Sequence, residues 1–178
     1  MAVYVLLVRA IGPVTHRKMS MAALRDGLLA AGLADVSTVG NTGNVLCRSP
    51  KGAAAVKKFA QGVIDVFGLG AMCEVFVRTP AQMAEVVAAN PFPNAALDHP
   101  ARVGVCVFHE EPDWPGAITA HEGPEELATV GAHLIIDYPE AAGAMAVERL
   151  VGKRMTQRNW RVFASLADKA AAMAEARG

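Results

Sequence analysis

The sequence predicts an α+β fold built from two ferredoxin-like α/β-sandwich halves with antiparallel sheets, followed by a C-terminal helix. Segments rich in β-branched residues alternate with segments whose apolar residues recur at helical spacing. In the first half these segments follow the order strand-helix-strand-strand-helix-strand, which is the ferredoxin-like arrangement. The second half repeats this order more loosely, and the chain closes with an amphipathic segment that begins near Thr156.

The first half opens with a predicted strand at Val3–Val8 and a loop over Ile11–Lys18. Ser20 can cap the first helix, and Gly32 ends it. The next elements are a strand at 35–39, a hairpin turn at 40–44, a strand at 45–48, a helix that starts at Ser49-Pro50 and a strand at 73–77. The apolar face of that second helix is expected to consist of Val56, Phe59, Ala60, Val63 and Phe67.

The second half begins with a helix at Thr79-Pro80 that the Asn90-Pro-Phe-Pro segment breaks. A strand at 102–108, a helix or turn at 112–120, a hairpin of 127–130 with 132–138, and a helix that Gly152 ends are expected to follow. Thr156 is the predicted cap of the last helix. The apolar face of this helix contains Trp160, Phe163, Leu166, Ala167, Ala170 and Met173.

No low-complexity linker interrupts the chain, which favours two subdomains that share an interface over two independent domains. We place the boundary near Arg78, so that residues 1–78 form the first subdomain and residues 79–178 form the second, terminal helix included.

Composition predicts a cytoplasmic protein. The chain has 178 residues, of which 53% are hydrophobic, but no apolar run reaches the roughly 20 residues that span a bilayer. The apolar stretch at Val3–Val8 is short and follows no cationic segment, so it is interpreted as a strand and not as a signal peptide. The cysteines are odd in number and far apart, which is typical of a reducing compartment.

The charges balance in total but not along the chain. With 17 basic and 17 acidic side chains, the formal net charge of zero argues against a nucleic-acid partner. Nine acids and no lysine or arginine lie between Val103 and Glu148, whereas five cations and no acid lie between Arg149 and Arg161. Two interpretations stay open. In the first, the acidic and basic segments are two solvated surfaces, and in the second, the basic segment forms an anion site.

Several short motifs resemble those of one bacterial family. In order along the chain, these are Arg9-Ala10-Ile11, Lys18–Met21, Leu24-Arg25, Thr42–Val45, Asn90-Pro91-Phe92, Tyr138-Pro139 and Thr156-x-Arg158-Asn159-Trp160. Together they make the chain similar to the family named domain of unknown function 1697, whose activity is not established. The resemblance implies a cytosolic α+β protein with no known cofactor.

The sequence also departs from that family. The resemblance implies Arg-Gly-Ile-Asn after the first strand, but this chain has Arg9-Ala10-Ile11-Gly12. It also implies Ser-Lys-Leu after a glycine-containing loop, where this chain keeps Gly143 but continues with Met145-Ala146-Val147. Serine and lysine at a helix N-terminus suit anion binding, so any anion site at that loop should be weaker here.

Motifs of several enzyme classes are absent from the sequence. It has no Gly-x-Ser-x-Gly elbow, no phosphate-binding loop with lysine, and no Gly-x-Gly-x-x-Gly after a strand. His109 and Glu110 are expected on opposite faces of a strand, and His133 and Asp137 lie roughly 13 Å apart by strand rise. We therefore expect no metal site, no cofactor and no identifiable catalytic residue, and the three cysteines are interpreted as buried apolar residues.

We expect a non-catalytic module that binds a phosphate- or carboxylate-bearing small molecule. A homodimer is the second partner that we consider. Guanidinium groups bind such oxyanions bidentately, and the candidate ligand-binding residues are Arg9, Lys18, Asn44, Arg158 and Asn159.

Three alternatives stay open. One is an enzyme whose site lies at the subdomain cleft and uses His16 or Lys18 with Gly43-Asn44. Another is an RNA- or DNA-binding protein, although the strands of the first half offer only Tyr4 and Phe76 for base stacking. The last is a purely structural dimer subunit, in which the C-terminal helix contributes to an apolar interface.

Overall fold

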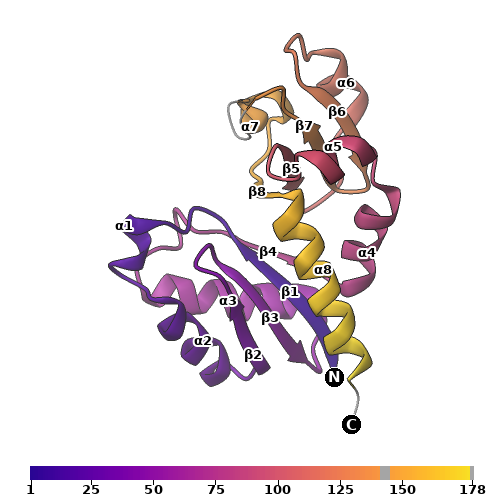
Figure 1. The fold of residues 1–178 in the computed structure, drawn as a ribbon. Coiled ribbons are helices and arrows are strands. Elements are labelled where there is room, and N and C mark those ends of the chain that lie inside the picture. The colour runs from indigo at the N-terminus through magenta and orange to yellow at the C-terminus, as the bar shows by residue number, and fades with distance from the viewer. Residues whose placement is uncertain (141–144, 177–178) are drawn as a thin grey trace. The chain divides into compact units, whose positions relative to one another are not determined.

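The structure is a computed structural model that describes residues 1–140 and 145–176. Gly143, which the family resemblance singled out, lies outside the described residues. Figure 1 shows the elements in chain order. The strands are β1 (Ala2–Val8), β2 (Ala34–Val39), β3 (Asn44–Ser49), β4 (Val75–Arg78), β5 (Val103–Val107), β6 (Glu126–Val130), β7 (His133–Asp137) and β8 (Thr156–Asn159). The helices are α1 (Pro13–His16), α2 (Met21–Ala30), α3 (Ala53–Val66), α4 (Pro80–Ala89), α5 (Pro93–Asp98), α6 (Trp114–Thr119), α7 (Val147–Val151) and α8 (Trp160–Glu175).

The first four strands form one antiparallel sheet in the order β2-β3-β1-β4. β1 pairs with β3 from Ala2 opposite Ser49 to Leu7 opposite Asn44. Its other edge pairs with β4, where Val5 lies opposite Arg78. This strand order is the ferredoxin-like one, so the sequence prediction for this half is confirmed.

Helices α2 and α3 cover this sheet and complete its core. Alternate residues of β1 enter the core because successive side chains on a strand point to opposite faces. They are Tyr4, Leu6 and Val8. The helices contribute residues three or four positions apart, namely Met21, Leu24 and Leu28 from α2 and Val56, Ala60 and Ile64 from α3.

The second sheet has the same topology, with the strand order β6-β7-β5-β8. The hairpin of β6 and β7 turns at Gly131, as predicted, and pairs Val130 with His133 and Glu126 with Asp137. β5 lies between β7 and β8 and is antiparallel to both. The predicted fold class, two ferredoxin-like halves and a C-terminal helix, is therefore confirmed.

The second sheet is covered on both faces. On one face, Trp114 of α6 packs edge-on against Phe108 with ring centroids 5.4 Å apart, in a core that also contains Leu134, Ile136 and Val147. On the other face, Phe163 of α8 meets the ring of His133 at 5.9 Å. The buried residues of α8 include Trp160, Phe163, Leu166, Ala167 and Ala170, which confirms most of the predicted apolar face.

The described chain divides into two compact units. The first contains Met1–Gln82 and the chain from Asp168 onward, and the second contains Met83–Ala167. The domain limits predicted above, 1–78 and 79–178, stay a prediction. Among the described residues, no helix combines the length and the apolar character needed to cross a membrane.

The structure corrects the predicted start of the last helix. Thr156–Asn159 forms strand β8 along β5, and α8 begins only at Trp160. The cap is Asn159, whose Oδ1 accepts a hydrogen bond from the Val162 amide at 2.9 Å. Thr156 is buried in the sheet, where its hydroxyl accepts from Arg158.

Other differences are local. α3 begins at Ala53 and not at Ser49, and Phe59 is 36% exposed while Ile64 takes the buried position. Two short helices, α1 and α5, occupy segments that were expected to be loop or helix break.

Candidate functional site

The loop between β1 and α2 is held to the rest of the first unit at several points. The amide of Val8 donates to the Gly43 carbonyl at 2.8 Å, and the amide of Arg9 donates to the Glu74 carbonyl at 2.9 Å. His16 contributes a third contact, because its Nε2 lies 2.8 Å from the Asn41 carbonyl oxygen. A loop fixed in this way can present side chains in a defined arrangement.

Within this loop, Arg17 and Lys18 are the exposed cations. Thr15, two residues before Arg17, and Met19, directly after Lys18, are both buried. The hydroxyl of Thr15 is engaged by both the amide and the carbonyl of Gly12 at 2.8 Å. With their neighbours anchored in this way, Arg17 and Lys18 are exposed to solvent.

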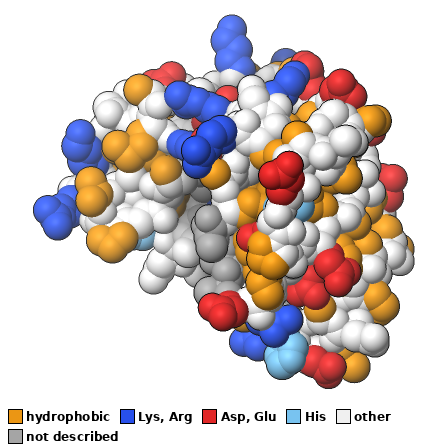
Figure 2. All heavy atoms as spheres, turned by 90° about the horizontal axis from the view of Figure 1, so that it is seen from above, with side chains coloured by type: hydrophobic (Ala, Val, Ile, Leu, Met, Phe, Trp, Pro, Cys, Tyr) orange, Lys and Arg blue, Asp and Glu red, His pale blue; other side chains and the backbone are white. Residues whose placement is uncertain are grey.

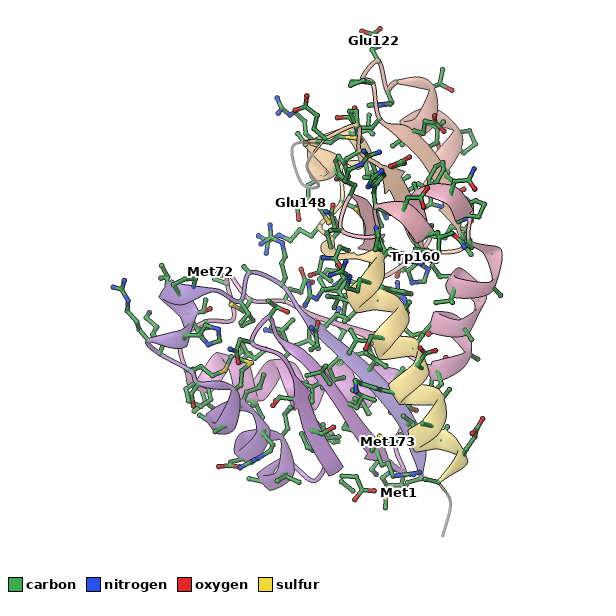
Figure 3. All side chains as sticks on the ribbon, viewed as in Figure 1. Met1, Met72, Glu122, Glu148, Trp160 and Met173 are labelled. Atoms are coloured by element: carbon green, nitrogen blue, oxygen red, sulfur yellow. The ribbon has the colours of Figure 1, made fainter. Side chains whose placement is uncertain are left out.

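Arg9 is the first residue of the same loop and contacts the segment before β4. Its Nη1 donates to the Met72 carbonyl at 3.3 Å, and the thiol of Cys73 lies 3.9 Å from the carbonyl oxygen of Ala10. Met72 is 47% exposed, and Figure 3 shows it at the end of the first unit where α1 lies.

We call Arg9, Val14, Arg17, Lys18 and Met72 the basic tip. Val14 of α1 is 63% exposed, so the tip joins apolar surface to cationic groups. Figure 2 shows Lys and Arg side chains beside hydrophobic ones at the left of the picture, where this end of the first unit lies. The nearby acid Glu74 already pairs with Lys57, at 4.0 Å. Two predicted residues, Arg9 and Lys18, belong to the tip.

Asn44, the third predicted residue of this unit, holds the β2–β3 turn. Its side chain is buried, and Nδ2 donates to the Thr42 hydroxyl at 3.0 Å and to the Val39 carbonyl at 3.3 Å. These contacts give Asn44 a structural use. A ligand contact by its amide stays a prediction.

The remaining predicted residues, Arg158 and Asn159, lie in the second unit. The Arg158 guanidinium donates from Nη1 to the Thr156 hydroxyl at 2.9 Å and to the Gln157 carbonyl at 2.8 Å. Loss of hydration lowers the pKa of Arg158 to about 10, so it stays charged at neutral pH. Asn159 caps α8. Both side chains therefore have structural partners in β8 and α8.

The cysteines are all buried and free. Burial raises the pKa of the Cys47 thiol to about 12, and it also raises the pKa values of Cys73 and Cys106. A nucleophilic cysteine needs a thiolate, which this environment disfavours. The interpretation of these cysteines as buried apolar residues is confirmed.

Metal-binding side chains and exposed aromatic rings are the remaining groups that could form a site. Across residues 1–140 and 145–176, no group of three His, Cys, Asp or Glu side chains is arranged to hold a metal ion. Tyr4, Phe76 and Trp160 are buried, so none of these rings is available for base stacking.

The second unit contains a pocket that sequence reasoning missed. It has a volume of about 280 Å3 and is lined by Pro91–Ala95, Glu126 and Asp137. None of the five predicted ligand-binding residues lines it. Its two carboxylates come from cross-strand neighbours, which the predicted hairpin around Gly131 already brings together.

The comparisons with known proteins agree with this fold. The conserved bacterial protein SP0830 from Streptococcus pneumoniae, a solved structure, is similar with a TM-score of 0.72 and 19% identity, over 96% of this chain and 99% of that one. At this identity the likeness shows the fold alone. No curated protein matches the chain.

Family membership is shown by the sequence. The match extends over residues 1–134, three quarters of the chain, and covers the motifs from Arg9 to Phe92. The motifs at Tyr138 and Thr156 lie beyond the matched residues. The chain therefore belongs to the family described as "Protein of unknown function (DUF1697)".

Proposed function

We propose that this protein is a non-catalytic module that binds a phosphate- or carboxylate-bearing small molecule at the basic tip. The observation that supports the proposal is the exposure of Arg17 and Lys18 on a loop that is anchored by the buried residues Thr15 and Met19. A guanidinium and an ammonium side by side can share one oxyanion, the first in a bidentate manner and the second as a point charge.

The surroundings of the tip support an anionic ligand. The loop from Arg9 to Lys18 contains no acid. The exposed side chains of Val14 and Met72 offer contact area to an apolar part of the ligand. A fixed loop also lowers the entropic cost of binding, because fewer side chains and backbone segments must be ordered.

A titration with two probes, pyrophosphate and citrate, tests this proposal by calorimetry at about 0.15 M ionic strength, where the Debye length is about 8 Å. The test variant is Arg17→Gln/Lys18→Gln. Its matched control is Lys51→Gln/Lys58→Gln, which removes two exposed cations from the same unit away from the tip. We expect at least one probe to bind, and we expect the tip variant to weaken binding roughly tenfold, as loss of charge-assisted contacts implies.

The control variant is expected to change the dissociation constant less than about twofold, because distant exposed charges are screened. Equal losses in the two variants would show that only total charge matters, and the proposal would then be wrong. Absence of binding by both probes to the unmodified protein would also refute it.

A further inference from the structure

The pocket of the second unit has the chemistry of a site for an organic cation. It lies between the start of α5 and the ends of β6 and β7 that carry Glu126 and Asp137. Its volume of about 280 Å3 is close to the lower end of ligand pockets, roughly 300 Å3. It can therefore hold a small molecule or one end of a larger one.

The charged side chains that line the pocket are both acids. Glu126 and Asp137 are direct partners in the β6–β7 ladder, so their carboxylates project from the same face of the sheet. Like charges in this position repel and destabilise a sheet. A cation bound between them would remove that repulsion.

A second, independent observation concerns hydrogen bonding. In the described part of the chain, three side-chain atoms are buried and have no hydrogen-bond partner, namely Asn90 Oδ1, Arg102 Nε and Asp137 Oδ1. Asp137 lines the pocket, Asn90 directly precedes its lining segment, and Arg102 lies beside Asp137. Buried polar atoms without partners are uncommon, so the one on Asp137, a residue that lines the pocket, calls for an explanation.

Arg102 does not neutralise the pocket fully. Its Nη2 lies 3.6 Å from Asp137 Oδ1, which is longer than a good hydrogen bond. The side chain of Asp137 is 21% exposed although Oδ1 is buried, so other atoms of this side chain reach solvent. Asp137 thus forms a weak ion pair with Arg102, and its exposed atoms remain accessible to a bound cation.

The backbone at Asn90 is strained as well. Asn90 has a φ of 29°, in the left-handed region that non-glycine residues seldom adopt, and it precedes Pro91. Phe92, two residues further along, lines the pocket, and the face of an aromatic ring can attract a cation. Such strain is concentrated at ligand sites in other proteins.

We propose that this pocket binds a small organic cation, an ammonium, guanidinium or amidinium group attached to a flat apolar body. The carboxylates of Glu126 and Asp137 would accept its hydrogen bonds, and Phe92 with the flanking prolines would contact its apolar part. A metal ion would not use those apolar walls, and the described residues supply no set of three metal-binding side chains.

Benzamidine is a suitable probe, because its amidinium is charged and planar. The uncharged isostere benzamide serves as the chemical control. Both are titrated at millimolar concentration into isotope-labelled full-length protein and followed by amide chemical shifts. We expect benzamidine to shift the amides around Phe92, Glu126 and Asp137 in a saturable manner, and benzamide to bind at least tenfold more weakly.

The test variant is Glu126→Gln, which changes an exposed side chain at the edge of the sheet and keeps its shape. Its matched control is Glu122→Gln, an exposed acid of the same unit that does not line the pocket. The first variant should weaken benzamidine binding about tenfold, and the second should leave it within about twofold.

Three results would each overturn the proposal. They are no saturable shifts near the pocket, equal binding of benzamide and benzamidine, and equal losses in the two glutamate variants. None of these results bears on the basic tip, because its probes and its residues are different.

Discussion

Replacing Gly43 by alanine tests how the loop of the basic tip is held. Gly43 has a φ of 75°, and a Cβ there would lie 2.6 Å from Ile11 Cγ1 and 2.9 Å from Val8 Cβ. The carbonyl oxygen of Val8 would be 3.0 Å away. The substitution therefore combines an unfavourable backbone conformation with overlap against the loop that carries Arg17 and Lys18.

The two costs can be separated. An alanine in the left-handed region costs about 1–2 kcal/mol, offset by about 0.4–1 kcal/mol through the lower entropy of the unfolded chain. Overpacking adds about 1–3 kcal/mol. We therefore expect Gly43→Ala to lower the free energy of unfolding by about 2–4 kcal/mol. Gly40 has a φ of 65° with no atom near the added Cβ, so Gly40→Ala should lower it by only about 1 kcal/mol.

Urea unfolding followed by far-ultraviolet circular dichroism is the appropriate assay. Tryptophan fluorescence would report on the wrong unit, because Trp114 and Trp160 both belong to Met83–Ala167. The double variant Gly43→Ala/Ile11→Ala removes the closest clashing atom, so part of the loss should be recovered relative to the sum of the single effects. Equal destabilisation by Gly43→Ala and Gly40→Ala would show that the overlap with Ile11 and Val8 contributes nothing, and additive effects of the Gly43 and Ile11 substitutions would show the same.

The other predictions concern single side chains. Asn159→Ala should lower the free energy of unfolding by about 1 kcal/mol through loss of the α8 cap, while Asn159→Asp should keep most of it; equal losses in urea melts would contradict the capping role. Ala10→Gly should raise it by about 0.5–1 kcal/mol, because Ala10 has a φ of 60° that glycine adopts freely; a lower urea midpoint would contradict this. The free energy of unfolding should fall as the pH rises from 9 to about 12, because the Cys47 thiol stays protonated in the folded protein while it ionises in the unfolded chain. This decline should be shallower in Cys47→Ala. An unchanged slope of the free energy against pH would count against the raised pKa.

The local signals in the sequence were sufficient for the strand order. The apolar run of β1, the turn around Gly43 and the cap at Ser20 each depend on neighbouring residues. Ser20 Oγ does accept from the Ala23 amide at 3.0 Å, as the capping pattern indicates. Connections between strands are short, and crossovers between parallel strands are right-handed, so a given order of strands and helices is compatible with few topologies. The fold class therefore followed from the order of these elements.

The start of α8 could not be read from local sequence. Thr156–Asn159 is polar and precedes an amphipathic segment, which is typical of a helix cap. Its extended conformation comes from pairing with β5, a contact between residues about fifty positions apart in the chain, such as Val105 and Arg158. Long-range pairing of this kind overrides the local preference.

The candidate sites were only partly accessible to sequence reasoning, for a similar reason. Arg9 and Lys18 were identified by residue type, but Arg17 emerges only when Thr15 and Met19 are seen to be buried. The pocket acids were within reach, since a tight turn after Val130 places Glu126 opposite Asp137. The contribution of Phe92 was not, because it depends on the fold of the Asn90–Pro93 segment against the sheet.

The balance of charges over the whole chain conceals surfaces that are locally unbalanced. The basic tip contains Arg9, Arg17 and Lys18, whereas the pocket of the second unit contains Glu126 and Asp137. The net charge of zero argues against a partner that binds through long-range attraction, but it does not constrain binding at short range, where a Debye length of about 8 Å limits what each site senses. Each site should thus select its own ligand by local charge, and added salt should weaken binding at both, although the two prefer ligands of opposite sign.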